Sequence, residues 1–297
     1  MEHHHHHNHV QEQSLNGIFI LSIILNVVFV LVETGVGLWQ DSLSLLRDAG
    51  HNLSDVFSLV LVLIAFSLAK KQRNERFTYG YRKSTVLISL LNAVILLVAV
   101  GAIVIESIHK FSEPTDVNGI AVSWTAGVGI LINGATALLL MRGQKNDLNV
   151  RGAFLHMAAD TLVSVGVVIS GIVIAYTGWT IIDPIVSLII AVVILISTRE
   201  LLSDSLRLAV DGIPDGVDIK EIEEHITENE HVKEVHHIHV WAISTTETAL
   251  TAHVVVDDIS CWPEISEHLK HELEEHGIAH ATLEPETEDC HCHNREC

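Results

Sequence analysis

Long apolar stretches dominate the first two thirds of the chain. A helix needs roughly 20 mainly apolar residues to cross about 30 Å of hydrocarbon. Six stretches reach that length: Gly17–Gln40, Leu43–Ala69, Ser84–His109, Val117–Met141, Gly152–Thr177 and Ile181–Leu201. We therefore predict a six-span transmembrane domain over residues 16–203. The first stretch is too long and too polar, at Asn26 and Glu33, to be a removable signal peptide.

Polar residues inside these stretches have a structural interpretation. For Asn26, Glu33, Asn92 and Asn133, we expect hydrogen bonds between helices, which polar side chains commonly make inside membranes. Asp183 precedes a proline, and proline is favoured in a first helical turn, so Asp183 is predicted to cap the sixth helix.

After Ser203 the pattern changes to short elements with an alternating period. It predicts a helix at Asp218–Asn229, strands at Glu234–Ser244 and Ala249–Asp257, a helix at Pro263–His276 and a strand at Ala279–Glu284. This α-β-β-α-β order indicates a small open α+β sandwich over residues 204–289.

Composition and charge divide the chain at the same place. Charged residues make up only 18% of the chain and the mean hydropathy is +0.38, whereas about a quarter of the residues in soluble domains are charged. After Ser203, Asp and Glu outnumber Lys and Arg by 23 to 5, a net charge near −18. A membrane-embedded part is therefore followed by an acidic, water-soluble part, and such acidity argues against nucleic-acid binding.

Basic residues predict the orientation in the membrane. Residues 70–83 hold six Lys and Arg and residues 142–151 hold three, whereas the alternate connections contribute only Lys110. Lys and Arg remain on the cytoplasmic side, so both termini are expected there. In that reducing compartment the four cysteines are expected to be thiols or metal ligands and not disulfides.

One charged pattern occurs twice inside the apolar stretches. His51 and Asp55 in the second, and His156 and Asp160 in the fifth, are each four residues apart and so share one helix face. We expect each pair a turn or two from the cytoplasmic end of its span. Such pairs have either a functional role or the purely structural role of a histidine–aspartate hydrogen bond that holds two helices together. Ionisable residues at membrane depth are functional by default, which favours the first interpretation.

Two imidazoles and two carboxylates form a four-coordinate set that suits Zn²⁺. Two carboxylates also cancel the charge of the dication, which lowers the cost of burying it. Calcium and magnesium prefer oxygen shells, and copper(I) prefers sulfur. Because histidine can exchange a metal ion for a proton, the set favours secondary active export. A passive divalent-metal channel and a membrane-anchored zinc buffer or sensor are the alternatives.

The chain resembles the cation diffusion facilitators, in particular their zinc-transporting branch. The resemblance rests on "DAGHNLSD", "FLHMAAD", "FTYGYRK", "DPIVSL" and "VHHIHVW". It implies a homodimeric, six-span metal/proton antiporter, not an enzyme, with a ferredoxin-like cytoplasmic domain. It implies that zinc, and also cadmium or cobalt, is carried at His51, Asp55, His156 and Asp160. It places a regulatory zinc site at His236, His253, Glu284 and Glu286, with Cys261 nearby.

The two ends are rich in potential metal ligands. Residues 1–15 contain a histidine run that is either native or an expression tag, and residues 290–297, "CHCHNREC", are either a metal-capturing tail or a disordered one. Short connections and a compact tail suggest a bacterial protein, which would reside in the inner membrane as a multi-pass protein surrounded by the lipid bilayer.

Overall fold

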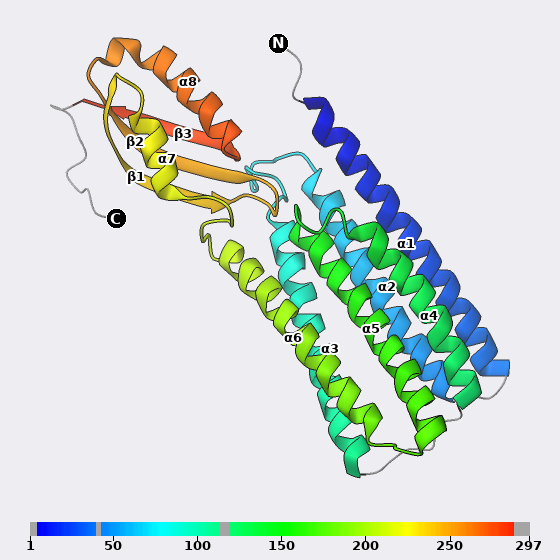
Figure 1. Ribbon diagram of the computed structural model, residues 1–297. Helices are drawn as coiled ribbons and strands as arrows, with labels where there is room; N and C mark the ends of the chain where they lie inside the picture. The colour runs from blue at the N-terminus through cyan, green and yellow to red at the C-terminus, as the bar shows by residue number, and fades with distance from the viewer. Residues whose placement is uncertain (1–4, 40–42, 113–118, 288–297) are drawn as a thin grey trace.

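The computed structural model describes residues 5–39, 43–112 and 119–287, which form an elongated helical bundle with a small sheet domain at one end (Figure 1). The bundle contains α1 (His5–Trp39), α2 (Leu43–Ala69), α3 (Ser84–Ser112), α4 (Gly119–Leu140), α5 (Leu148–Thr177) and α6 (Ile182–Ala209). Successive helices run in opposite directions. The tail at 290–297 and the side chains of the histidine run at 3–7 lie outside the described residues.

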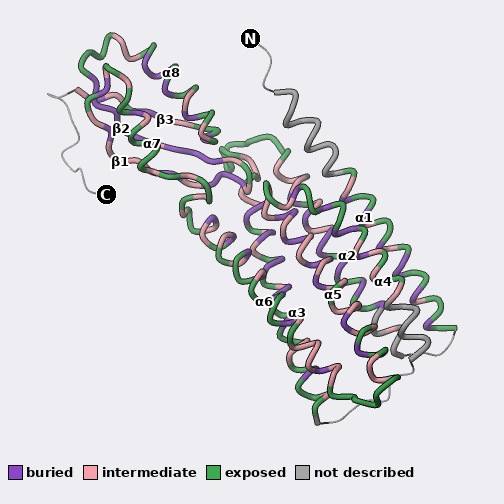
Figure 2. The backbone as a smooth tube through the Cα atoms, in the orientation of Figure 1, coloured by how far each residue is buried: buried purple, intermediate pink, exposed green. Residues whose placement is uncertain are grey.

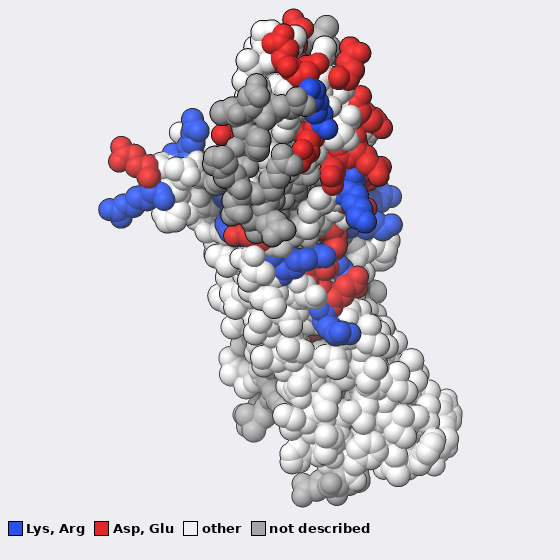
Figure 3. Space-filling view, turned by 90° about the vertical axis from the view of Figure 1, so that its left-hand side faces the viewer, with Lys and Arg blue, Asp and Glu red and all other residues white. Residues whose placement is uncertain are grey.

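The bundle surface is suited to lipid. Among the described residues, five helices are long and apolar enough to cross a membrane, and α4 contributes a shorter apolar helix, Gly127–Leu140. Large apolar residues such as Leu31 of α1 and Leu131 of α4 are 66% and 71% accessible. Exposed residues occur along the length of the bundle helices (Figure 2). Charged side chains on the face in Figure 3 gather over the sheet domain and the adjoining end of the bundle. The protein is therefore an integral, multi-pass membrane protein.

Close packing and a few polar contacts hold the bundle together. A Cβ on Gly166 of α5 would lie 2.5 Å from Cδ1 of Ile190 on α6, so a larger residue there would require the isoleucine side chain to move. The amide of Asn52 on α2 donates to Glu33 Oε2 on α1 at 2.8 Å, which confirms the interhelical bond predicted for Glu33. Asn26 instead donates to the carbonyl of Ser22 in its own helix, because its short side chain reaches the preceding turn.

The capping prediction for Asp183 is wrong. Helix α6 begins at Ile182 with Ile181 as its N-cap, so Asp183 lies within the first turn. Its carboxylate accepts a hydrogen bond from Nζ of Lys110, at the end of α3, at 2.9 Å. The aspartate therefore joins two helices at the end of the bundle far from the sheet domain.

The sheet domain has the predicted α-β-β-α-β order. Its elements are α7 (Ile219–Thr227), β1 (Val232–Ala242), β2 (Thr248–Val256), a 3₁₀ turn (Ile259–Cys261), α8 (Trp262–Glu275) and β3 (Ile278–Glu286). The central strand β2 is antiparallel to β1 and parallel to β3. Its inward residues, such as Leu250 and Val254, pack against Ile226 of α7 and Leu269 of α8. The predicted fold class, a helical membrane domain followed by an α+β domain, is confirmed.

Polar contacts join the sheet domain to the bundle. Lys83, which directly precedes α3, donates from Nζ to the carbonyl of Leu208 at 2.7 Å, to Oδ1 of Asp211 at 2.6 Å and to the carbonyl of Ala242 at 3.0 Å. The turn between β1 and β2 also reaches the bundle, because the hydroxyl of Thr245 donates to Oδ2 of Asp147, the N-cap of α5, at 3.0 Å. The strands of the sheet are thus connected to helices of the bundle.

Candidate metal centre

Two antiparallel helices bring the two repeated motifs together. Helix α2 runs toward the sheet domain and α5 runs away from it (Figure 1). When two identical histidine–aspartate pairs face each other on antiparallel helices, each histidine meets the aspartate of the other helix. Nε2 of His51 lies 3.4 Å from Oδ1 of Asp160, and Nε2 of His156 lies 2.7 Å from Oδ1 of Asp55. The four residues therefore form one reciprocal cluster.

The depth predicted for one motif is wrong. His156 lies in the third turn of α5, counted from the end nearest the sheet domain. His51 also lies in the third turn of its helix, but α2 begins at the opposite end of the bundle. The third turns of α2 and α5 are therefore counted from opposite ends of the bundle. The two motifs meet in the interior of the bundle and not near one membrane surface.

Burial within the cluster is uneven. The side chain of Asp55 is 0% exposed and that of His156 is 7% exposed, whereas Asp160 is 14% and His51 is 52% exposed. The second carboxylate oxygens of Asp55 and Asp160 have no hydrogen-bond partner among the described residues. Buried carboxylate oxygens are costly to leave without a donor or cation. The cluster is thus closed on the Asp55 side and accessible on the His51 side.

The cluster has the donor set of a zinc site. His51, Asp55 and Asp160 each offer one ligand atom, and these atoms lie within 4.8 Å of one another. Nε2 of His156 is 3.7 Å from Oδ2 of Asp160 and completes the group. Zinc binds imidazole nitrogen and carboxylate oxygen at about 2.0–2.2 Å in a tetrahedron, so small side-chain adjustments would seat one ion.

A second group of histidines and glutamates lies on the sheet. Strand register places His236 of β1 opposite His253 of β2, and His253 beside Glu284 of β3. Nδ1 of His253 is 2.6 Å from Oε1 of Glu286, and Nε2 of His236 is 3.3 Å from Oε2 of the same carboxylate. Nε2 of His253 lies 3.6 Å from Oε2 of Glu284. Four of the five residues named for a regulatory site are therefore neighbours.

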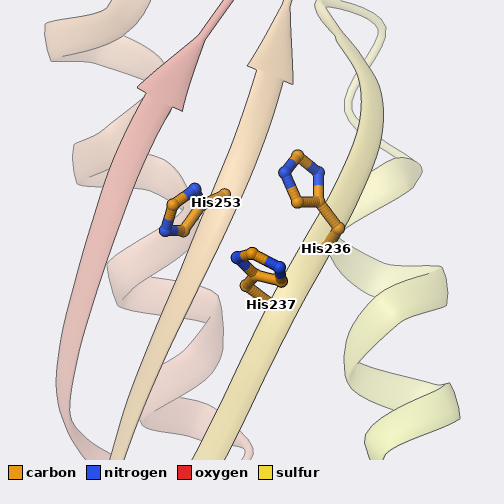
Figure 4. Close-up of side chains that lie close together, drawn as sticks. All are labelled: His236, His237 and His253. Atoms are coloured by element: carbon orange, nitrogen blue, oxygen red, sulfur yellow. The ribbon is translucent and has the colours of Figure 1, made fainter. Parts of the chain in front are cut away.

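His237 also belongs to this group, and the sequence reasoning missed it. Strict alternation would place it on the face opposite His236. The structure instead has a register shift between His236 and His239, and His237 has a φ of 51°. This irregularity brings the ring of His237 to 5.0 Å from that of His253, and Figure 4 shows the three histidines gathered in front of the sheet. A strand bulge has no reliable signature in a "VHHIHVW" segment.

Cys261 lies apart from these histidines. It is a free, partly buried thiol that directly precedes α8 and packs against the apolar core between the helices and the sheet. The histidine cluster occupies the sheet face that the helices do not cover (Figure 4). We therefore leave Cys261 out of the candidate site.

Comparison with known proteins agrees with the geometry. Residues 19–208 match the family described as cation efflux transmembrane domain, and residues 214–288 match the cation efflux protein cytoplasmic domain, a dimerisation domain that supports a homodimer.

Relatives match over most of the chain. The cadmium, cobalt and zinc/H(+)-K(+) antiporter of Bacillus subtilis (strain 168) is 36% identical over 97% of this chain and 93% of its own length. The zinc transporter ZitB of Escherichia coli (strain K12) is 36% identical over 90% and 87%. CzcD of Cupriavidus metallidurans, a metal cation efflux system protein, is 32% identical over 91% and 86%. The names of these relatives describe transporters and not enzymes, and this chain belongs to the cation efflux family, the cation diffusion facilitators.

Proposed function

We propose that this protein exports Zn²⁺ from the cytoplasm in exchange for protons, with His51, Asp55, His156 and Asp160 as the transport site. The reciprocal pairing of two histidines with two aspartates inside the bundle is the observation that carries the proposal. Zinc is favoured by the mixed nitrogen and oxygen donors. Relatives named for cadmium, cobalt and zinc support the same class of ion, with cadmium and cobalt as further substrates.

The short contact between His156 and Asp55 supports proton exchange. Their atoms are 2.7 Å apart, the distance of a hydrogen bond that holds a proton between nitrogen and oxygen. A zinc ion about 2 Å from each atom cannot occupy that gap without pushing them apart. Metal and proton therefore compete for the same two atoms. Zinc binding would release the proton, and a proton arriving from the other side would expel zinc.

The sheet cluster is proposed as a regulatory zinc site and not as part of the transport path. His236, His253, Glu284 and Glu286 lie in the domain beyond the bundle, where they cannot form the barrier between compartments. Nδ1 of His236 is buried without a hydrogen-bond partner among the described residues, which leaves it available to a cation. Zinc there would offset the acidity of the domain and brace two copies of the chain against each other.

The proposed arrangement in the membrane follows the basic residues. Loops 70–83 and 142–151 lie at the sheet-domain end of the bundle, so this end faces the cytoplasm, together with both termini. The chain then divides into a histidine-rich tail (1–15), the transmembrane domain (16–203), the regulatory domain (204–289) and the cysteine-rich tail (290–297). The compact connections fit a bacterial inner membrane.

Flux measurements in proteoliposomes test the proposal. Purified protein would be reconstituted with a zinc-sensitive dye inside the vesicles, with and without an opposing pH gradient. Exchange predicts that a gradient drives zinc uphill and that zinc entry moves protons the other way. Downhill flux without proton movement would indicate a channel. Binding without flux would indicate a membrane-anchored buffer or sensor.

A further inference from the structure

Three imidazole rings come together on the sheet. His236 and His237 are neighbours in β1, and His253 lies in β2 (Figure 4). The ring centroids are 5.2 Å apart between His236 and His237, 5.0 Å between His237 and His253 and 5.4 Å between His236 and His253. Each ring offers one nitrogen, and these three nitrogens lie within 4.8 Å of one another. The three rings are therefore within reach of a single ion.

The backbone of β1 departs from a regular strand to bring the ring of His237 to the other two. In a regular strand, consecutive side chains point to opposite faces. The φ of His237 is 51°, in the left-handed region, and the pairing of β1 with β2 shifts between His236 and His239. Among the described residues, Asp211 is the only other non-glycine residue with a positive φ. Residues are rarely held in this conformation, and those that are cluster at ligand sites. A strained bulge that turns one imidazole toward two others therefore indicates that this ring has a ligand.

The surroundings of the three rings favour a cation. The side chain of His236 is only 9% exposed, and neither of its ring nitrogens makes a hydrogen bond within the described part of the chain. Buried polar atoms are costly to leave in this state. The carboxylate of Glu286 lies beside the rings, with Oε2 3.3 Å from Nε2 of His236 and Oε1 2.6 Å from Nδ1 of His253. A metal ion would give His236 a partner, and Glu286 would offset part of the charge of that ion.

We propose that His237 supplies the third imidazole of the zinc site on the sheet, so that His236, His237 and His253 bind one Zn²⁺ ion together. This inference rests on the regulatory site proposed above and adds the ligand that the strand bulge brings to it. Three imidazoles favour zinc over calcium and magnesium, which prefer oxygen. They leave the fourth position of a tetrahedral ion to a carboxylate or water. Because the ion binds the bulged strand, it would also stabilise the left-handed backbone of His237.

Residue-resolved chemical modification of the full-length protein in detergent tests this role of His237. Diethyl pyrocarbonate modifies unprotonated imidazole nitrogens, and tandem mass spectrometry of peptides reports each histidine separately, despite the transport site in the bundle. Zinc should protect His237 and His253 with one shared midpoint. His271 of α8, whose side chain is 72% exposed, serves as the internal control and should keep its reactivity.

Two substitutions remove the ring of His237 but keep its backbone conformation. Glycine and asparagine both tolerate a positive φ, so His237→Gly and His237→Asn should retain the bulge and lose the ligand. Loss of an outer partner alone weakens metal binding about 10- to 100-fold. The zinc concentration that half-protects His253 should therefore rise at least about tenfold in both variants. His239→Asn changes an exposed histidine of the same strand outside the group of three and should leave this midpoint unchanged.

The midpoint of His253 separates the role of His237 from the existence of the site. An unchanged midpoint in both His237 variants would overturn the proposal and leave zinc bound by His236, His253 and the glutamates. No protection of His253 in the unaltered protein would overturn the whole zinc site of the sheet. Amide hydrogen exchange of β1 without zinc checks the fold of the variants. His237→Gly relieves the backbone strain, so its strand should be at least as well protected as in the unaltered protein, and a raised midpoint there reports the lost ring.

Discussion

The two candidate metal clusters, one in the helical bundle and one on the sheet, are built from different kinds of secondary-structure contact. In the bundle, a four-residue helical spacing occurs on two antiparallel helices, and reciprocal contacts such as His156 to Asp55 follow from it. On the sheet, lateral register places His236, His253 and Glu284 side by side, although they are far apart in the chain. A helical site therefore appears in the sequence as a repeated motif, whereas a site built across strands does not.

The two clusters also differ in what surrounds them. Asp55 is 0% exposed inside the bundle, whereas the side chain of Glu284, the most exposed member of the sheet cluster, is 69% exposed and that of Glu286 is 8% exposed. Removing a partner inside the bundle leaves a buried charge without compensation, which costs about 3–5 kcal/mol. At Glu284 water replaces a lost partner, and exposed ion pairs contribute only about 0–1 kcal/mol. A charge-removing substitution should therefore have a much larger effect at Asp55 than at Glu284.

The largest effect is expected for Asp55→Asn. The zinc-loaded site would then carry an uncompensated positive charge in a buried position. A penalty of about 3–5 kcal/mol corresponds to at least about 100-fold weaker zinc binding, so zinc flux in proteoliposomes should be nearly abolished.

Asp183→Asn provides the matched control for this variant. It neutralises another aspartate of the bundle, but one that pairs with Lys110 at the far end and not with the cluster. Flux in this control should stay close to that of the unaltered protein. Equal flux in Asp55→Asn and Asp183→Asn would refute the assignment of the transport site.

A smaller, qualitative effect is expected for His51→Asp. The site would then hold one imidazole and three carboxylates, a harder donor set with an extra negative charge, which favours manganese relative to zinc and cadmium. Competition between these metals in the flux assay measures the order of preference. His109→Asp, which changes an exposed histidine on α3 outside the cluster, is the control. An unchanged order in His51→Asp would show that His51 does not set metal choice.

Much of the architecture could be predicted because it depends on local patterns. Six apolar stretches and the α-β-β-α-β alternation have periods that are visible in the chain. The depth of His51 does not follow from its place in the sequence alone, because α2 and α5 begin at opposite ends of the bundle. His237 was missed because a bulge reverses the face that alternation assigns to it.

On the sheet, a His236→Ala, His253→Ala double variant should retain transport. The domain is proposed to shift a conformational equilibrium and not to carry the ion. Loss of zinc binding on the sheet should therefore change only the zinc concentration needed for transport, by a factor set by the coupling energy, typically about 5- to 150-fold. Flux measured against cytosolic-side zinc should need more zinc for the same rate. A His231→Ala, His271→Ala double variant, which changes exposed histidines, should match the unaltered protein. Complete loss of flux in the folded variant would place the domain on the transport path.

The smallest effect is expected at Asp147, where the sheet domain contacts the helix that carries His156. Asp147 caps α5 by accepting from the backbone N–H of Asn149 at 2.7 Å and also accepts from Thr245. Asp147→Ala removes both bonds and should cost about 1 kcal/mol. The first turn of α5 should then exchange its amide hydrogens faster in mass-spectrometric measurements.

Asp147→Asn separates the cap from the charge. Asparagine also accepts hydrogen bonds at an N-cap, and burial raises the pKa of the Asp147 carboxyl, so the ionised form is disfavoured in the folded state. The folded protein therefore binds this proton more tightly than the unfolded chain. The resulting loss of folding stability is absent at pH values below the ordinary carboxyl pKa and grows as the pH rises above it. Asp147→Asn should protect α5 at least as well as aspartate at neutral pH, and this advantage should shrink as the pH falls toward 4. Exchange as fast in Asp147→Asn as in Asp147→Ala would show that the carboxylate charge, and not the cap geometry, connects the sheet domain to the transport helix.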